Sequence, residues 1–226
     1  MKNTGRCVII SAGEIRNYER ARSLLRQDDF FIFCDGGLAY AHALGVEPDL
    51  IVGDFDSCIP SELEKYKKSV QSSASCKKIP CEIVTLPREK DDTDTFFAVK
   101  LAMERGFEDF IFLGAMGSRF DHAFGNVSIL LYLFYKGKKA LIADDYSLMR
   151  ICGNQPLYIE DSRPYFSVLT IAGAASGVTI KNAKYPLENA LLSPEFQLGI
   201  SNEVLPGCKA EVSVKNGVVL LVEVLK

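Results

Sequence analysis

Two aspartates, Asp54 and Asp56, stand two residues apart in the segment VGDFDS, at the end of an apolar run. Side chains of an extended chain alternate with a period of two, so both carboxylates point to the same side. Two interpretations follow: a polar loop with both groups hydrated, or a Mg²⁺ ion held between them, since carboxylate oxygens are its preferred ligands. The isolated string favours the hydrated loop.

Further acidic strings follow other apolar runs, notably CDGG at Asp35 and KDDTDT at residues 90–95. Ligands of an open parallel sheet bind outside the carboxyl ends of its strands, so such strings can share one crevice. Thr93 or Asp92 would cap the helix that follows, and the helix dipole favours acids in its first turn. Capping explains one or two of the aspartates at 91–94, and the remainder can supply metal ligands or a carboxylate near a substrate hydroxyl.

The string GAMGSRFDHAFGN adds a positive charge to these acids. Its glycines allow close approach of a phosphate, and Arg119 can hold phosphate oxygens with two parallel hydrogen bonds. The alternative is a surface pair between Arg119 and Asp121, and His122 is typical of a solvated helix face. The chain has no GxxxxGK[ST] or GxGxxG string. The combination predicts metal-assisted phosphoryl chemistry without a P-loop.

Composition excludes several other classes of function. The 226 residues carry a formal charge of −3 without a basic block, so we expect no nucleic-acid partner. Seven cysteines without a CxxC pair, and only two histidines, argue against a zinc site or a disulfide framework. No segment approaches the roughly 20 apolar residues of a membrane span, and the first apolar run is too short for a signal peptide. The expectation is a cytoplasmic protein without membrane contact.

Two patterns of secondary structure divide the chain. Residues 1–144 alternate short apolar runs with helical patterns at 17–27, 37–45 (GLAYAHALG), 60–70 (PSELEKYKKSV), 94–105 and 121–135. This alternation predicts a Rossmann-like α/β domain, mostly parallel, with helices on both faces of its sheet. Residues 145–226 carry short alternating segments separated by Gly, Pro and Asn, which predicts an all-β sandwich. The first domain would carry the metal and nucleotide chemistry.

Five strings in order give a more specific indication: DGG at Asp35, GDFDS at Gly53, KDDTD at Lys90, GSRFDHAFGN at Gly117 and GISNE at Gly199. Together they resemble the thiamine pyrophosphokinase family over essentially the whole chain. The resemblance implies a thiamine diphosphokinase, which transfers the pyrophosphoryl group of ATP to the hydroxyl of thiamine and gives thiamine diphosphate and AMP. It also implies a homodimer with its sites between subunits, and a second domain that binds thiamine and dimerises.

The resemblance assigns residues to the Mg²⁺ and nucleotide end of the site. The metal ligands, which with Arg119 form the catalytic set, would be Asp54, Asp56 and Asp94. Residues that contact the nucleotide or order the site would be Asp35, Gly36, Asp91, Thr93 and Asp121. The proton of the hydroxyl would go to Asp94 or Asp56, and the sequence does not choose between them.

The thiamine end is implied by fewer residues. Ser201 matches the position that touches the pyrimidine ring, from the other subunit, and its neighbour Asn202 is the weaker candidate. Eukaryotic members stack a tryptophan on thiamine, whereas this chain has none. Another side chain or another pose of thiamine must therefore replace that contact.

Alternative functions stay open at this stage. The metal end would look the same in a pyrophosphokinase acting on another hydroxymethyl heterocycle, such as a pterin alcohol. A metal-dependent phosphoesterase and a catalytically silent nucleotide or vitamin binder are also compatible with the acidic strings. The apolar terminal run GVVLLVEVLK predicts a dimer contact in the second half, with an ordinary sandwich core as the alternative.

Overall fold

A computed structural model describes residues 5–55, 64, 66, 81–89 and 91–225. The chain divides into two compact units, Met1–Asp145 and Tyr146–Lys226, and each is described by itself. Within the described ranges, no helix combines the length and the apolar character needed to span a bilayer.

The first unit is built on a parallel sheet whose strands lie in the order β6, β5, β1, β2, β3, β4. Helices cover both faces of such a sheet, so its inner strands read as continuous apolar runs. Every residue of the central β1 is fully buried. The strands are β1 Cys7–Ile10, β2 Phe30–Cys34, β3 Leu50–Gly53, β4 Glu82–Thr85, β5 Asp109–Leu113 and β6 Lys139–Ala143.

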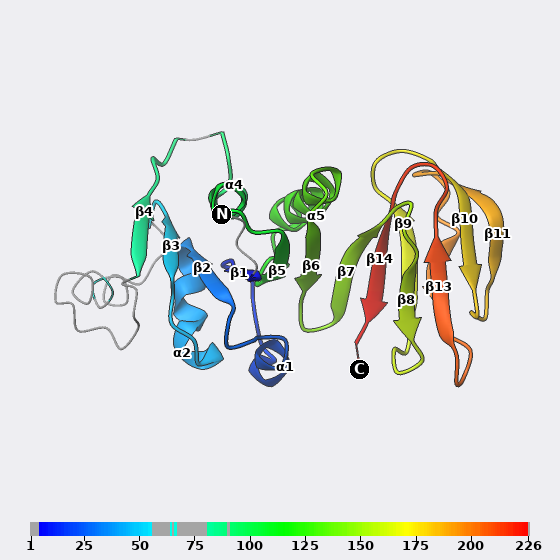
Figure 1. Ribbon diagram of the computed structural model, residues 1–226, viewed down its shortest axis with the longest axis horizontal. Helices are drawn as coiled ribbons and strands as arrows, with labels where there is room; N and C mark the ends of the chain where they lie inside the picture. Colours follow the sequence, from blue (N-terminus) through cyan, green and yellow to red (C-terminus); the bar gives the residue numbers. More distant parts are fainter. Residues whose placement is uncertain (1–4, 56–63, 65, 67–80, 90, 226) are drawn as a thin grey trace. The chain divides into compact units, whose positions relative to one another are not determined.

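The helices of this unit divide between the two faces of the sheet. They are α1 Tyr18–Ser23, the 3₁₀ helix η1 Asp35–Tyr40, α2 Ala41–Leu44, α4 Asp94–Glu104 and α5 Phe120–Tyr135. Figure 1 shows α1 with α2 on one side and α4 with α5 on the other, as expected because right-handed crossovers run outward from β1 to β4 and return through β5 to β6. The chain continues from β1 to α1 on one face and from β5 to α5 on the other, and open α/β sheets bind ligands at such a reversal of strand order. The predicted α/β class is confirmed.

Three predicted helices differ from the structure or cannot be compared with it. The helix predicted at 17–27 is shorter, because Asn17 stays outside as the N-cap, its Oδ1 accepting from the Arg20 N–H at 3.0 Å, and the helix ends at Ser23. The helical pattern after Gly36 forms a 3₁₀ turn and then the short α2. The pattern PSELEKYKKSV lies largely outside the described residues. The other two helices fall within one residue of their predicted bounds.

The second unit consists of two antiparallel sheets, as predicted for a sandwich. One has the order β12, β9, β14, β7 and the other β11, β10, β13, β8. Side chains of both sheets, such as Phe166 and Val212, pack in one buried cluster. The strands are β7 Ser147–Cys152, β8 Leu157–Glu160, β9 Phe166–Thr170, β10 Ala175–Lys181, β11 Leu187–Leu192, β12 Gly199–Asn202, β13 Lys209–Ser213 and β14 Val219–Val224.

The apolar terminal run forms β14, which lies between β7 and β9 in its sheet. Val219 and Leu221 are fully buried in the sandwich core. For both side chains, packing in the sandwich core therefore accounts for their apolar character. This is the alternative to the dimer contact predicted for the run.

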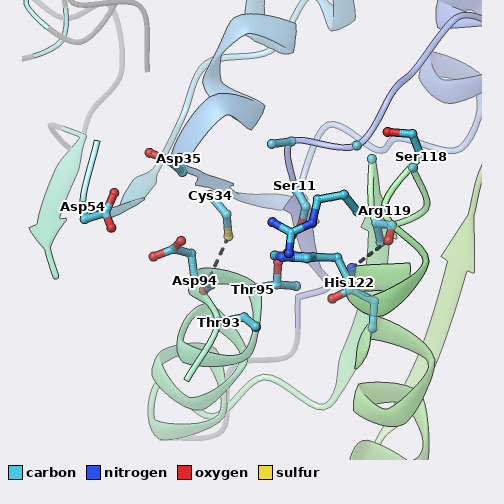
Figure 2. A pocket seen from close by; sticks show the side chains of 16 residues that line it. Ser11, Cys34, Asp35, Asp54, Thr93, Asp94, Thr95, Ser118, Arg119 and His122 are labelled. Carbon is cyan, nitrogen blue, oxygen red and sulfur yellow. Dashed lines mark hydrogen bonds between the residues drawn. The ribbon is translucent and has the colours of Figure 1, made fainter. Parts of the chain in front are cut away.

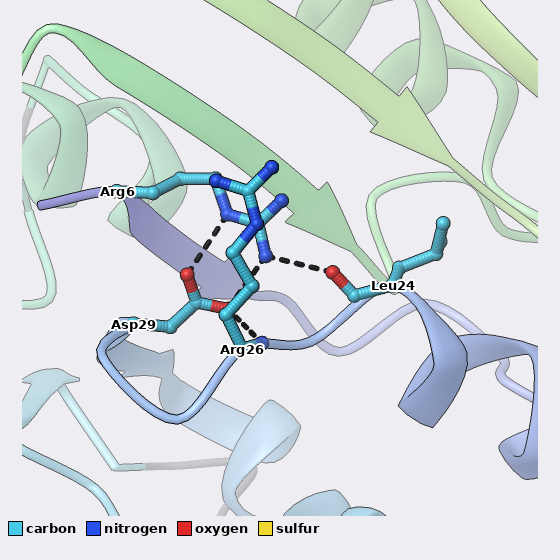
Figure 3. A network of polar contacts seen from close by, with 4 residues as sticks. All are labelled: Arg6, Leu24, Arg26 and Asp29. Atoms are coloured by element: carbon cyan, nitrogen blue, oxygen red, sulfur yellow. Dashed lines mark hydrogen bonds and ion pairs between the residues drawn. The ribbon is translucent and has the colours of Figure 1, made fainter.

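A buried ion pair ties the start of β1 to the segment that leads into β2 (Figure 3). Asp29 accepts two hydrogen bonds from the Arg6 guanidinium, at 2.8 and 2.7 Å, and one from the Arg26 N–H at 2.7 Å. Arg6 also donates to the carbonyl of Leu24 at 2.7 Å. The pair thus fixes the neighbouring strands whose far ends carry the loops of the candidate site.

Candidate functional site

A cavity of about 530 Å³ lies at the carboxyl ends of the strands of the first unit. It lies at the reversal of strand order, and the loops that follow β1 and β5 both contribute to its lining. Figure 2 shows the acids on one side and Arg119 and His122 on the other. Its lining includes Ser11, Gly13, Cys34, Asp35, Asp54, Thr93, Asp94, Thr95, Gly114, Arg119, His122 and Asn126.

Backbone forms one wall of the cavity, where the loops after β1 and β5 touch. The Gly13 N–H donates to the Gly114 carbonyl at 2.7 Å, and a Cβ on Gly13 would lie 2.5 Å from that oxygen. Gly114 has φ +59°, a conformation that favours glycine. No side chain fits between the two loops, and Gly13 and Gly114 line the cavity with backbone alone. Such a wall suits a phosphate group.

The acids come from the ends of β2 and β3 and from the start of α4. Asp35 has φ 46°, a left-handed conformation that Asp tolerates better than most residues. Asp94 opens α4 after the N-cap Thr93, whose Oγ1 accepts from the Phe96 N–H at 3.2 Å. The Oδ1 atoms of Asp35 and Asp94 are both shielded from solvent. Together with the half-buried Asp54, these carboxyl groups form an acidic wall of the cavity.

Two buried contacts hold this acidic wall in place. Ser11 and Thr95 share a hydrogen bond between their hydroxyls at 2.8 Å, which links the loop after β1 to α4. The thiol of Cys34 lies 3.8 Å from the Asp94 carbonyl. Burial, and then the negative charges of Asp94 and Asp35, raise the pKa of this thiol. Cys34 is therefore a neutral packing group.

Arg119 and Asp121 form the surface pair that the sequence offered as an alternative. Their side chains meet at 2.6 Å and are 69% and 65% exposed. The hydrogen bond from Arg119 lowers the pKa of the Asp121 carboxyl. The pairing does not remove Arg119 from the site, because the residue also lines the cavity. An incoming phosphate would compete with Asp121 for the guanidinium.

The structure brings together part of the predicted metal and nucleotide set. The cavity is lined by Asp35, Asp54, Thr93, Asp94 and Arg119. Asp91 and Asp121 instead line a neighbouring groove between α4 and α5. Gly36 lines neither the cavity nor this groove. Asp56 lies outside the described residues.

No group of three His, Cys, Asp or Glu side chains in the described part of the chain is arranged to hold a metal ion. Mg²⁺ does not require such a cage, because it is usually bound by one or two carboxylates, several waters and substrate phosphates. The hard oxygens of Asp54 and Asp94 meet that need. A cation would also offset the cost of the buried carboxylate charge.

The two residues predicted for the thiamine end lie on β12 of the second unit. Asn202 is 3% exposed, and its amide joins both backbone groups of Tyr185, at 3.0 and 2.7 Å. This side chain therefore holds the fold together locally. Ser201 is exposed and has φ 58°, with its N–H donating to the Ser167 hydroxyl at 3.1 Å.

Several lining residues were not predicted. Ser11 and Gly13 belong to the string SAGEI, which matched no phosphate-binding motif, although its position at a strand end was a usable signal. Asn126 is buried and donates to the Ala115 carbonyl at 2.6 Å, which fixes the loop after β5 to α5. Thr95 becomes recognisable only through its contact with Ser11.

Comparison with protein-family models gives two matches. Residues 21–142 match the model described as "Thiamin pyrophosphokinase, catalytic domain". Residues 156–219 match "Thiamin pyrophosphokinase, vitamin B1 binding domain". The first match alone covers more than half of the chain.

Individual relatives agree with these matches. The chain is 25% identical over 198 residues to the thiamine pyrophosphokinase of Bacillus subtilis, covering 85% of this chain and 86% of the relative. It is 28% identical over 168 residues to thiamine pyrophosphokinase 1 of Oryza sativa subsp. japonica, covering 70% of this chain and 60% of the relative.

Solved structures share the fold at lower identity. The crystal structure of the Bacillus subtilis thiamine pyrophosphokinase superposes with a TM-score of 0.83 at 22% identity, covering 98% of this chain and 99% of that one. The Candida albicans thiamin pyrophosphokinase gives a TM-score of 0.78 at 13% identity, covering 98% and 89%. With both halves matched by models of one family, the chain belongs to the thiamin pyrophosphokinase family.

Proposed function

We propose that this protein is a thiamine pyrophosphokinase, which transfers the pyrophosphoryl group of ATP to the hydroxyl of thiamine and releases AMP. The observation that carries the proposal is the cavity at the reversal of strand order, in a unit that matches the catalytic model of the family. Its acidic wall and Arg119 face each other across the space where phosphates would lie. Phosphoryl transfer depends on such positioning and charge balance.

Mg²⁺ is the metal that these residues fit. Asp54 and Asp94 would hold it, with Asp56 as a further ligand and Asp35 beside them. When bound, it would neutralise phosphate charge. The other contacts come from the chain itself: the glycine loops present peptide groups to the phosphates, Thr93 orders the start of α4, and Arg119 exchanges Asp121 for phosphate oxygens.

The reaction needs one proton acceptor. The thiamine oxygen forms a bond to the β-phosphorus, the bond from that phosphorus to the α,β-bridging oxygen breaks, and AMP leaves with the bond's electron pair. The hydroxyl proton passes to a carboxylate, for which Asp94 and Asp56 are the candidates. Asp94 stands in the cavity wall with one oxygen shielded from solvent.

We place the thiamine contact and the dimer interface in the second unit. Ser201 is exposed on β12, and large apolar side chains are exposed beside it, at Leu198 and Ile200. A second copy of the chain would cover these side chains and carry Ser201 to its partner's site, and Asn202 would support the strand. The described cysteines are free thiols, which fits a reducing compartment such as the cytoplasm.

The test is a direct assay of both products. Purified protein with thiamine, ATP and Mg²⁺ should form AMP and thiamine diphosphate in equal amounts, resolved by chromatography. Turnover of a pterin alcohol in place of thiamine would move the function to another heterocycle. Release of phosphate without an acceptor would indicate a phosphoesterase instead.

Replacing the carboxylate of Asp54 with an amide tests the role of its negative charge. Asp54→Asn should lower kcat at least about 100-fold, the upper end of the loss seen when even outer-shell partners of a metal are removed. Asp28→Asn is the matched control, because Asp28 is exposed just before β2, at the other end of the strands. Equal activities of the two variants would contradict the proposed role of Asp54.

A further inference from the structure

The loop between β1 and α1, residues 11–17, forms part of the backbone wall of the catalytic cavity. Two hydrogen bonds hold its first half against the loop after β5. The Ser11 N–H donates to the Leu113 carbonyl at 2.9 Å, and the Gly13 N–H donates to the Gly114 carbonyl at 2.7 Å. Gly13 has no side chain that could pack against its surroundings. Its position therefore also depends on how the second half of the loop is held.

Asp145 holds that second half. Its carboxylate accepts the N–H of Arg16 through Oδ2 at 2.8 Å and the N–H of Asn17 through Oδ1 at 2.9 Å. Its carbonyl accepts a hydrogen bond from the Arg20 guanidinium at 2.6 Å. Hydrogen bonds to a carboxylate are roughly twice as strong as those between neutral groups. Asp145 is thus bound both to the end of the loop and to α1.

The order of the strands explains how residues 128 and 129 positions apart in the sequence can meet. β1, β5 and β6 run parallel, so their carboxyl ends lie at one edge of the sheet. Asp145 stands two residues after the end of β6, in the same compact unit as the loop. It is not among the residues that line the cavity. A role of Asp145 in the cavity would therefore be exerted through the loop.

The contact has a local and a functional interpretation. Asn17 is the N-cap of α1, so the carboxylate can serve simply to fix the start of that helix. However, Gly13 lies only three residues before Arg16, and a chain of that length spans at most roughly 11 Å. Fixing Arg16 therefore restricts where Gly13 can move.

We propose that Asp145 is a positioning residue for phosphate binding. By holding the end of the loop, it keeps Gly13 against Gly114 in the wall of the cavity. Polar groups that are fixed before binding need no reorganisation when the ligand arrives, so a loosened loop should bind phosphate more weakly. That these phosphates belong to ATP rests on the proposed function. Phosphate binding itself can be measured without turnover.

The first test measures phosphate binding in variants of Asp145. Isothermal titration calorimetry gives the Kd of inorganic tripolyphosphate in the presence of Mg²⁺. In Asp145→Ala this Kd should rise about tenfold or more, as for the loss of groups that orient metal ligands. Asp145→Asn keeps one acceptor oxygen and should show a smaller rise. In the product assay, the KM for ATP should rise while the KM for thiamine stays unchanged.

The matched control is Asp161→Ala in the second unit. The Asp161 carboxylate also accepts a backbone N–H, that of Gly207 at 2.9 Å, and both residues are exposed. Its removal should leave the Kd of tripolyphosphate within about twofold of the original value.

The second test locates the effect within the loop. The Gly13 N–H is bonded to the loop after β5, so its exchange with solvent deuterium reports whether the two loops stay together. In Asp145→Ala, exchange measured by NMR should be at least about tenfold faster at Gly13, as well as faster at Arg16 and Asn17. A residue that only fixes the start of α1 would change exchange at Arg16 and Asn17 and not at Gly13.

The outcomes separate this proposal from the proposed function. Weaker tripolyphosphate binding in Asp145→Ala, in a protein that does not turn over thiamine, would support the positioning role and defeat the function. Normal turnover with unchanged tripolyphosphate binding in a folded Asp145→Ala would overturn the positioning role alone. Unchanged exchange at Gly13 would also overturn it, as would failure of the unaltered protein to bind tripolyphosphate. If Asp145→Ala does not fold, Asp145→Asn gives the same comparison.

Discussion

Removing the carboxylate of Asp29 should destabilise the first unit severely. The side chains of Arg6 and Asp29 are 8% and 0% exposed and are joined at 2.7 Å. Asp29→Ala would leave the Arg6 guanidinium buried without its counter-charge and the Arg26 N–H without its acceptor. Breaking one partner of a buried pair costs about 3–5 kcal/mol of folding free energy. At about 2–4 °C per kcal/mol for a chain of this size, Tm should fall by roughly 6–20 °C.

Far-UV circular dichroism during heating and in urea measures this effect. Asp28→Ala is the matched control, because the neighbouring carboxylate is exposed, and its change should stay within about 0.5 kcal/mol. The double variant R6M/D29L should be more stable than Asp29→Ala, since two apolar groups leave no buried charge. A loss below about 1 kcal/mol in Asp29→Ala, or a double variant less stable than the single one, would refute the reasoning.

Three further predictions concern the candidate site. Gly37→Ala should lower the free energy of unfolding by about 1–3 kcal/mol and should also lower activity, because a Cβ at this position would lie 2.4 Å from the Ile10 carbonyl oxygen. Thermal melting measures the loss of stability, and the product assay measures the loss of activity. Burial and the adjacent carboxylates raise the pKa of the Cys34 thiol, so peptide mapping after alkylation at pH 8 should show slower labelling of Cys34 than of the half-exposed Cys208. Arg119→Gln should raise the pKa of Asp121 towards its ordinary value, measured by an NMR titration; an unchanged pKa would show that the guanidinium does not set it.

The fold class was predictable because the two halves bury their strands differently. Residues of β1 and β5 are covered by helices on both faces, so they form continuous apolar runs, whereas a strand such as β9 alternates buried and half-buried residues. Helices α4 and α5 were predictable because their apolar residues recur over three or more turns. The helix after Gly36 was not, since a short helical pattern does not distinguish a 3₁₀ turn from an α-helix.

For the candidate site, the sequence predicted which kinds of side chain are present but not the full set of residues that line the cavity. Strand-end position picked out Asp35, Asp54 and Asp94, because parallel strands bring their carboxyl ends to one edge. It could not pick out Thr95, whose place in the lining comes with a hydrogen bond to Ser11, a residue 84 positions away in the sequence.

The sequence by itself determined the alternation of elements, the family and the supply of carboxylates at the strand ends, because all three are recorded in local order and spacing. Tertiary structure decided which of these groups share a space: Asp54, Asp94 and Arg119 line the cavity, while Asp91 and Asp121 line the groove beside it. It also paired Arg119 with Asp121. These outcomes depend on strand order and helix packing, which bring together residues that local spacing does not relate.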